Sequence, residues 1–156
     1  QIAFANECAL ICTSLGIDVA RVRELVNKVP YREMHEPGGG VGGHCIPKDP
    51  WLLAAAAPHD RPLRLIPAAR DINDRMPEEV ARMTLKTISD LIDVTDRNPI
   101  VAVLGYAYRP ETGDTRNSPT ERLIEVLEGS GAEVQVHDPY VVGHVQIPSC
   151  PLKRMF

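Results

Sequence analysis

The segment from residue 98 to residue 138 restricts the fold most, because its pattern changes twice. It opens with IVAVLG, residues 100–105, a continuous apolar run rich in β-branched residues that is typical of a buried parallel strand. Ser118-Pro119-Thr120-Glu121 then has the form of a capping box with proline at the first helical position. EVQVHDP, residues 133–139, alternates like a second strand. Strand, helix and strand form a βαβ unit, so residues 97–156 are expected to be the first part of a Rossmann-like α/β domain.

Residues 1–96 have helical patterns only, and we expect them to form a separate helical domain. The first helix is apolar on more than one face, which is typical of a helix buried in a core or a subunit interface. The remaining helix limits come from capping signals. They place Gly16 after the first helix and Asp18 at the N-cap of the second. A third helix is expected to begin with Asp49 at its N-cap and Pro50 at its first position. Two further helices are expected, one over residues 61–74 and the next beginning at Pro77.

Composition excludes several classes of protein. The 156 residues are 44% hydrophobic and 24% charged, with a net charge of −4, as in ordinary globular proteins. Lys and Arg are scattered and aromatic residues are few, so no nucleic-acid partner is expected. No apolar run approaches the roughly 20 residues of a membrane span and no secretory leader is visible, so a cytoplasmic location is expected. The first helical pattern begins without a cap, which indicates a piece of a longer protein.

The stretch HEPGGGVGGHCIPKDPW, residues 35–51, contains five glycines and three prolines around one thiol. Gly38, Gly40 and Gly43 spell G-x-G-x-x-G, but no strand-like run precedes them, and a dinucleotide site requires one. The glycines are better explained by close approach of the backbone to another group, or by positive φ.

Cys45 is the candidate nucleophile. Positive helix ends and nearby cations make thiolates available, and Lys48, with His44 as a second candidate, supplies a cation within a few residues. Asp49 adds a carboxylate, which completes a plausible constellation for covalent catalysis. The structural alternatives remain open: Asp49 as a helix N-cap only, and His44 bonded to the loop backbone. Cys8 and Cys12 are expected to pack as small apolar side chains.

Several ordered stretches resemble one family. GGGVGGHCIPKDPW resembles the active-site segment of the nucleotide-sugar 6-dehydrogenases, the UDP-glucose and GDP-mannose dehydrogenase superfamily. IAFANE and RDIND resemble parts of its central domain. VLGYAYRPETGDTRNSP and VQVHDPYV resemble the opening of its nucleotide-sugar-binding domain. The resemblance covers residues 1 to about 142, and His44 with Pro50-Trp51 is similar to the N-acetylhexosamine branch.

The resemblance implies an NAD-dependent oxidation of the C6 alcohol of a UDP-N-acetylhexosamine to a uronate for polysaccharide synthesis. Two hydride transfers would pass through a thiohemiacetal and a thioester of Cys45, with Asp49 positioning or deprotonating water. It also implies a homodimer formed through the central helices. The other roles that it implies are an NAD contact for Arg116 and substrate contacts for Gly40, Gly42, Gly43, Lys48, Tyr108, Arg109 and, in the partner's site, Arg32.

Three alternatives stay open. From the residues alone, Arg109 and Arg116 would be solvated loop cations. The chain could be a non-catalytic dimerisation or sugar-nucleotide-binding module with an inert Cys45, or a metal site could use His44, Cys45, Cys8 and Cys12. The family's NAD-binding domain and its catalytic lysine and asparagine have no counterpart in these 156 residues, so the chain alone is expected to be inactive.

Overall fold

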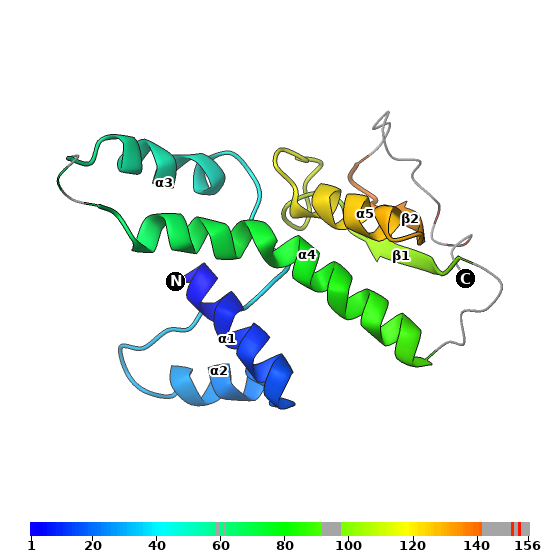
Figure 1. The fold of residues 1–156 in the computed structure, drawn as a ribbon, viewed down its shortest axis with the longest axis horizontal. Coiled ribbons are helices and arrows are strands. Elements are labelled where there is room, and N and C mark those ends of the chain that lie inside the picture. The colour runs from blue at the N-terminus through cyan, green and yellow to red at the C-terminus, as the bar shows by residue number, and fades with distance from the viewer. Residues whose placement is uncertain (59, 61, 92–97, 142–150, 152, 154–156) are drawn as a thin grey trace.

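The computed structural model describes residues 1–58, 60, 62–91, 98–141, 151 and 153. Helices come first and a small α/β unit follows, as the sequence predicts (Figure 1). The proposed domain boundary after residue 96, most of the segment 143–156, and Cys150 lie outside the described residues. The elements are α1 (Ile2–Leu15), α2 (Val19–Asn27), α3 (Cys45–Ala55), α4 (Leu65–Leu91), β1 (Ile100–Leu104), α5 (Pro119–Gly129) and β2 (Glu133–His137).

Helix α4 is the central element of the structure. It contacts α1 and α3 along its first half and α5 along its second half (Figure 1). The prediction that a new helix starts at Pro77 is wrong, because α4 runs through this residue without a break. Pro77 removes one backbone donor and bends the helix, and α4 changes direction near its middle in Figure 1. Burial of Met76, Pro77 and Ala81 against neighbouring elements offsets the cost of the proline.

The limits of the first two helices agree with their capping signals. Gly16 follows α1 with a left-handed φ of 67°. The Asp18 carboxylate accepts a hydrogen bond of 2.8 Å from the Ala20 N–H at the start of α2. Local chemistry therefore fixes both ends of this turn.

The start of α3 differs from the prediction. The helix begins at Cys45, with His44 in the N-cap position, and Asp49 and Pro50 lie inside it. The Asp-Pro pair is a good start signal, but the backbone is already helical four residues earlier. Cys45 is therefore the first residue of the helix, and Asp49 does not act as its N-cap.

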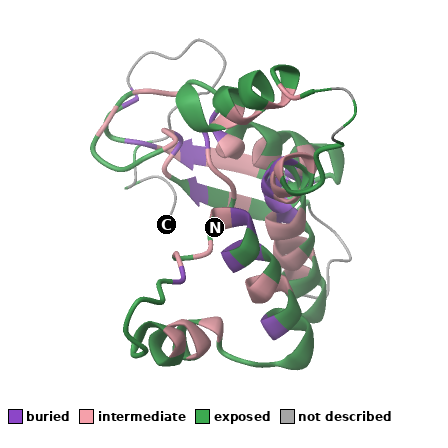
Figure 2. Ribbon diagram, turned by 90° about the vertical axis from the view of Figure 1, so that its left-hand side faces the viewer, coloured by how far each residue is buried: buried purple, intermediate pink, exposed green. Residues whose placement is uncertain are grey.

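The two strands are parallel, in register from Ile100↔Glu133 to Leu104↔His137. Helix α5 covers one face, where Leu127 is 1% exposed. Val103 and Val136 are buried in the small core, whereas Ile100 and Leu104 are more than 60% exposed. Figure 2 shows buried and exposed positions mixed along the strands. The first strand is thus parallel as predicted, but only part of it is buried in the described structure.

The loop after β1 is fixed by side chains from two other segments. The Asp138 carboxylate, after β2, accepts hydrogen bonds from the backbone N–H groups of Tyr106 (2.7 Å), Ala107 (2.9 Å) and Tyr140 (2.8 Å). Burial alone would raise the pKa of Asp138, but these backbone donors, with that of Val141, leave it below its ordinary value. Ser118 donates to the Tyr106 carbonyl (2.6 Å) while its hydroxyl oxygen caps α5.

The glycine segment joins the helical and α/β parts of the chain. The Gly43 N–H donates to the Arg116 carbonyl (2.8 Å), and the Asn117 side-chain amide donates to the Gly43 carbonyl (2.8 Å). A Cβ atom on Gly42 would lie 2.3 Å from the Asn117 carbonyl oxygen and 2.7 Å from Tyr108 Cβ. Only glycine allows the two backbones to approach this closely.

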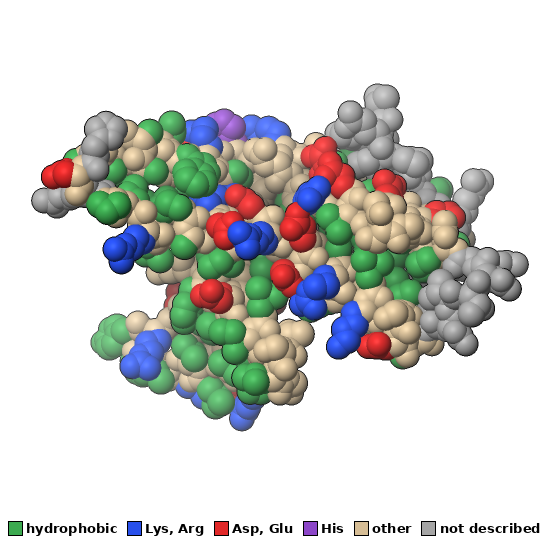
Figure 3. Space-filling view, viewed as in Figure 1, with side chains coloured by type: hydrophobic (Ala, Val, Ile, Leu, Met, Phe, Trp, Pro, Cys, Tyr) green, Lys and Arg blue, Asp and Glu red, His purple; other side chains and the backbone are tan. Residues whose placement is uncertain are grey.

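On the face that Figure 3 shows, acidic and basic side chains are interspersed and hydrophobic side chains gather over α1 and α2. Among the described residues, no helix combines the length and the apolar character that crossing a membrane requires.

We expect Asp138→Asn to lower the free energy of unfolding by about 1.5–3 kcal/mol at neutral pH, because a buried carboxylate loses charged hydrogen bonds. The folded pKa is depressed, so this stabilisation is present above the unfolded carboxyl pKa of about 3.9 and is lost as the pH falls towards the lower folded value. Urea unfolding at neutral and acidic pH checks both points. A difference between wild type and variant that grows in acid would contradict this account, and Asp90→Asn, at an exposed position, is the control.

We expect Gly42→Ala to destabilise the chain by about 2–3 kcal/mol, because the new methyl group overlaps backbone atoms that cannot rotate away. Gly38→Ala is the matched control in the same loop, since a Cβ atom there meets nothing within 4 Å. Thermal unfolding of both variants measures the contrast. Equal melting temperatures would show that the two backbones do not pack as described.

Candidate functional site

Cys45 lies exposed at the first position of α3. Its Sγ atom is 4.0 Å from His44 Nδ1. Because Cys45, Lys48 and Asp49 all lie in the helix at spacings of three and four, their side chains share one face. The structure therefore brings together the thiol, the cation and the carboxylate that the sequence singled out.

Lys48 and Asp49 form an ion pair within this face. Their Nζ and Oδ1 atoms are 2.5 Å apart, and both side chains are about half exposed (45% and 55%). The ammonium group is thus bonded to Asp49 rather than to the thiol. The carboxylate remains open to solvent, where it can contact a water molecule.

Buried asparagines hold the glycine segment that precedes Cys45. The side-chain oxygen of Asn6, in α1, accepts the Gly38 N–H (2.8 Å). Asn73, in α4, bonds to both the N–H (2.9 Å) and the carbonyl (3.4 Å) of Val41. Asn6 is 0% and Asn73 is 7% exposed. Sequence reasoning missed both residues, although a polar side chain in the apolar first helix was a visible signal.

The three glycines predicted to contact substrate have packing roles within the chain. At Gly40, with φ 112°, a Cβ atom would lie 3.1 Å from Pro119 Cβ. At Gly43, with φ 86°, it would lie 2.9 Å from the Tyr108 ring. Together with the Gly42 contacts, these distances explain the glycines without a ligand. Their contact with a sugar nucleotide stays a prediction.

Arg116 is 63% exposed and lies beside the Cys45 segment, since its carbonyl accepts the Gly43 N–H. Its guanidinium binds the Asp114 carboxylate through Nε (2.9 Å to Oδ1) and Nη2 (2.6 Å to Oδ2). Mainly through these bonds, Arg116 lowers the pKa of Asp114 to about 2. Asp114 was missed by sequence reasoning, although an acid two residues before an arginine can make this fork.

A pocket of about 460 Å³ opens at the carboxyl ends of the two strands. Tyr108 and Arg109 line it, together with the segment Asp138, Pro139 and Tyr140 that follows β2. Tyr108 is half-buried and its ring also lies against Gly43. In open α/β sheets this edge is the usual ligand site. The contact of Tyr108 and Arg109 with a nucleotide stays a prediction.

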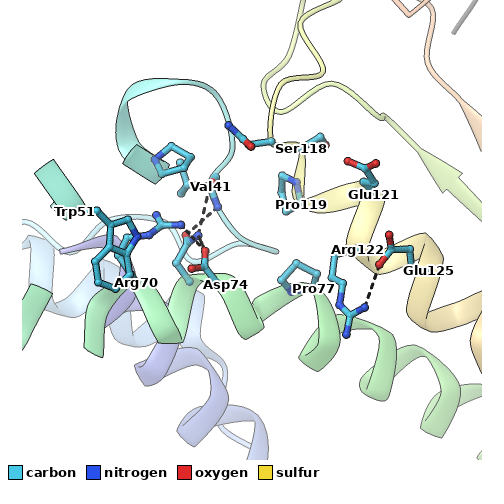
Figure 4. A pocket seen from close by; sticks show the side chains of 13 residues that line it. Val41, Trp51, Arg70, Asp74, Pro77, Ser118, Pro119, Glu121, Arg122 and Glu125 are labelled. Carbon is cyan, nitrogen blue, oxygen red and sulfur yellow. Dashed lines mark hydrogen bonds and ion pairs between the residues drawn. The ribbon is translucent and has the colours of Figure 1, made fainter. Parts of the chain in front are cut away.

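A second pocket, of about 450 Å³, lies between α3, α4 and the start of α5 (Figure 4). Arg70 lies in it beside Trp51 and is only 6% exposed. Its guanidinium donates to the Ile46 carbonyl (3.3 Å) and forms an ion pair with Asp74. On the other side of the pocket, Arg122 of α5 bonds to Glu78 of α4 (2.7 Å).

Arg32 is not brought to either pocket. It follows α2, which lies on the opposite side of α4 from α3 (Figure 1), and its side chain is exposed. Its predicted role in a partner's site stays a prediction. Within the described residues no three His, Cys, Asp or Glu side chains come together as metal ligands, so the metal alternative has no support.

Relatives of this chain are dehydrogenases. The chain is 44% identical to the UDP-N-acetyl-D-mannosamine dehydrogenase of Pyrococcus horikoshii over 143 residues, which are 92% of this chain and 34% of the relative. It is 37% identical to the enzyme of the same name from Escherichia coli K12, over 90% of this chain and 34% of that protein. The chain thus spans about a third of the length of these relatives.

Solved structures agree with the sequence relatives. The UDP-D-ManNAc dehydrogenase structure from Pyrococcus horikoshii matches 99% of this chain, and 35% of its own, with a TM-score of 0.86 and 41% identity. The NDP-N-acetyl-D-galactosaminuronic acid dehydrogenase from Methanosarcina mazei Go1 matches equal shares with a TM-score of 0.88 and 33% identity.

Two family models match consecutive parts of the chain. The model of the central domain of the UDP-glucose/GDP-mannose dehydrogenase family matches residues 1–75. The model of the UDP binding domain of this family matches residues 102–147. The two matches follow one another along most of the chain, and with the relatives and the shared fold they establish that the chain belongs to the UDP-glucose/GDP-mannose dehydrogenase family.

Proposed function

We propose that this chain carries the reactive thiol and the nucleotide-sugar site of an NAD-dependent dehydrogenase. Its substrate would be a UDP-N-acetylhexosamine, with the N-acetylmannosamine form named by the relatives as the first candidate. One observation carries the proposal: Cys45 is exposed at the first position of α3, on a segment bonded directly to the α/β part. The thiol is thereby held near the domain that would bind the nucleotide.

The chemistry of Cys45 is a stepwise oxidation of C6. Loss of a hydride and a proton from the C6 alcohol gives an aldehyde, and the Cys45 thiolate adds to its carbon to form a thiohemiacetal. Loss of a second hydride, together with the hydroxyl proton of the adduct, converts the thiohemiacetal to a thioester. Water then hydrolyses the thioester, which releases the carboxylate and regenerates the thiol. The covalent adduct retains the reactive aldehyde between the two oxidations.

Asp49 and Lys48 are assigned to the hydrolytic part of the reaction. The Asp49 carboxylate is exposed one helical turn from the thiol, where it can orient or deprotonate a water molecule. Lys48 holds that carboxylate in place through the ion pair and can bind a substrate oxygen with its remaining N–H groups.

NAD, when bound, would accept the two hydrides. Arg116 fits a contact to its phosphates, because the side chain is exposed, is always charged and lies beside the Cys45 segment. The ion pair with Asp114 fixes the guanidinium in one orientation.

The UDP part of the substrate would bind at the carboxyl ends of β1 and β2. Arg109 offers a cation for the diphosphate and Tyr108 an aromatic face for the base or sugar. The glycine segment and Tyr108 connect this pocket to Cys45, which fits one extended ligand that reaches both.

Two copies of the chain are proposed to associate through the central helices. On α1, Phe4, Ile11 and Leu15 are each more than 50% exposed, as in a face that a partner covers. In such a dimer, Arg32 would act in the site of the other copy.

The test of the reaction is a chimera in which these residues replace the segment of the Pyrococcus horikoshii relative that they match. We expect two NADH per UDP-N-acetylmannosamine, and a loss of about 10³-fold or more with Cys45→Ser, because the nucleophile is removed. Cys8→Ser, at a half-buried thiol in α1, is the control and should retain activity. A folded chimera that forms no NADH from the N-acetylmannosamine, N-acetylglucosamine or glucose nucleotides would favour a binding module with an inert thiol.

Binding of UDP tests the strand-end pocket separately. We expect Arg109→Ala to weaken UDP binding about 10-fold or more, because a charged hydrogen bond to phosphate is lost. Isothermal titration calorimetry of the 156-residue chain at fixed salt provides the measurement. Arg64→Ala removes the same charge from an exposed position outside this pocket and should leave the dissociation constant unchanged. An equal loss of UDP affinity in both variants would indicate nonspecific electrostatic attraction of UDP to the protein.

A further inference from the structure

Two prolines lie in the helix that carries Cys45. Pro47 and Pro50 have no backbone N–H, so neither can donate to the carbonyl four residues before it. For Pro50 this carbonyl belongs to Ile46, inside the helix. For Pro47 it belongs to Gly43, which precedes the N-cap residue His44 and is not paired by the helix whatever residue stands at 47. The two carbonyls lie on either side of His44 and Cys45. The backbone next to the thiol therefore has acceptors that the helix itself cannot pair.

Side chains from other elements pair with both carbonyls. Arg70 of α4 donates to the Ile46 carbonyl (3.3 Å), and Asn117, just before α5, donates to the Gly43 carbonyl (2.8 Å). These two residues are far apart in the sequence and contact the Cys45 segment from different sides.

Arg70 is held firmly enough to act as an anchor. It is 6% exposed, and its ion pair with Asp74 fixes the guanidinium. Its Nε atom is buried and has no hydrogen-bond partner in the described part of the chain. A buried unpaired donor is costly, so the bonds of the terminal nitrogens must offset that cost.

Asn117 is suited to its position by backbone conformation as well as by its amide. Its φ of 50° lies in the left-handed region, which asparagine tolerates better than most residues. The same segment accepts the Gly43 N–H through the Arg116 carbonyl, so Gly43 is bonded on both sides.

We propose that Arg70 and Asn117 are positioning residues for Cys45: Arg70 replaces the donor that Pro50 cannot supply to the Ile46 carbonyl, and Asn117 holds the Gly43 carbonyl just before the helix. The inference rests on the proposed function only in taking Cys45 as the reacting group. The start of helix α3 is then hydrogen-bonded to α4 on one side and to the α/β part on the other, and the position of the thiol depends on both bonds. With an ordinary residue at position 50, the helix would pair the Ile46 carbonyl itself and would lose the attachment to Arg70.

Hydrogen exchange of the backbone amides in residues 44–53 of the full chain tests whether Arg70 and Asn117 hold the start of α3. We expect Arg70→Met to speed their exchange about tenfold or more, since a charged hydrogen bond is lost. Asn117→Gly keeps the left-handed φ and removes the amide, and it should speed exchange about threefold or more. The matched controls are Arg75→Met, which breaks the equivalent surface pair with Asp71 in α4, and Asn98→Gly at an exposed position.

A rescue separates the missing donor from a general loss of stability. Pro50→Ala restores an N–H that can bond to the Ile46 carbonyl, so in this background Arg70→Met should speed exchange no more than about threefold. An equal effect of Arg70→Met in both backgrounds would overturn the proposal. So would unchanged exchange in Asn117→Gly, which decides the matter if Arg70→Met does not fold.

Activity of the chimera tests the link to Cys45. We expect Asn117→Gly and Arg70→Met to lower kcat at least tenfold, while KM stays within about twofold, because they displace the thiol and leave the strand-end pocket intact. Faster exchange with an unchanged kcat would show that Arg70 and Asn117 only stabilise the start of α3, and it would reject their positioning role. A chimera that is inactive even without these substitutions would count against the proposed function, while the exchange result would stand.

Discussion

The contact between the Gly42–Gly43 backbone and the segment around Asn117 is the constraint on which the arrangement depends. Here the helical part and the α/β part approach to a distance that admits no side chain, and the hydrogen bonds on both sides of Gly43 fix their register. Cys45, Arg116 and Tyr108 all lie within two or three residues of this contact or in it. A shift of either backbone would separate the thiol from the pocket at the strand ends.

Helix α4 makes that contact possible, because it supports both parts at once. Its first half holds the Cys45 segment through Arg70 and Asn73, and its second half packs on α5 through Ala81 and the Glu78–Arg122 ion pair. The bend at Pro77 falls between these two sets of contacts. A single continuous helix therefore transmits the geometry of one half to the other, which two separate helices joined by a loop would not do.

The sequence predicts the parts of this structure that are determined locally. Gly16, Asp18 and the Ser118 cap act within one turn of the backbone, and the alternation of β2 is a property of a few neighbours. The predicted starts of helices at Asp49 and Pro77 were wrong because long-range contacts, not local sequence, decide whether a helix tolerates Pro50 or Pro77 in its interior. The same holds for the buried asparagines, whose partners are more than thirty residues away. Cys45, Lys48 and Asp49 were singled out by residue type and spacing, whereas the roles of Arg109 and Arg116 were predicted only from the resemblance to a family, because from the residues alone they would be solvated loop cations.

The prolines of the Cys45 helix show how such non-local dependence can serve a reactive group. A thiol at the start of an ordinary helix would be positioned by the helix alone, whose first turn is its least constrained part. Pro50 removes the donor that would pair with the Ile46 carbonyl, and Arg70 binds this carbonyl instead. Asn117 binds the Gly43 carbonyl, which lies just before the helix. The end of the helix is thereby tied to the rest of the fold at the residues that flank the thiol. These attachments lie at the end of α3 that carries the nucleophile, whereas Leu52 and Leu53, near its far end, are about 60% exposed.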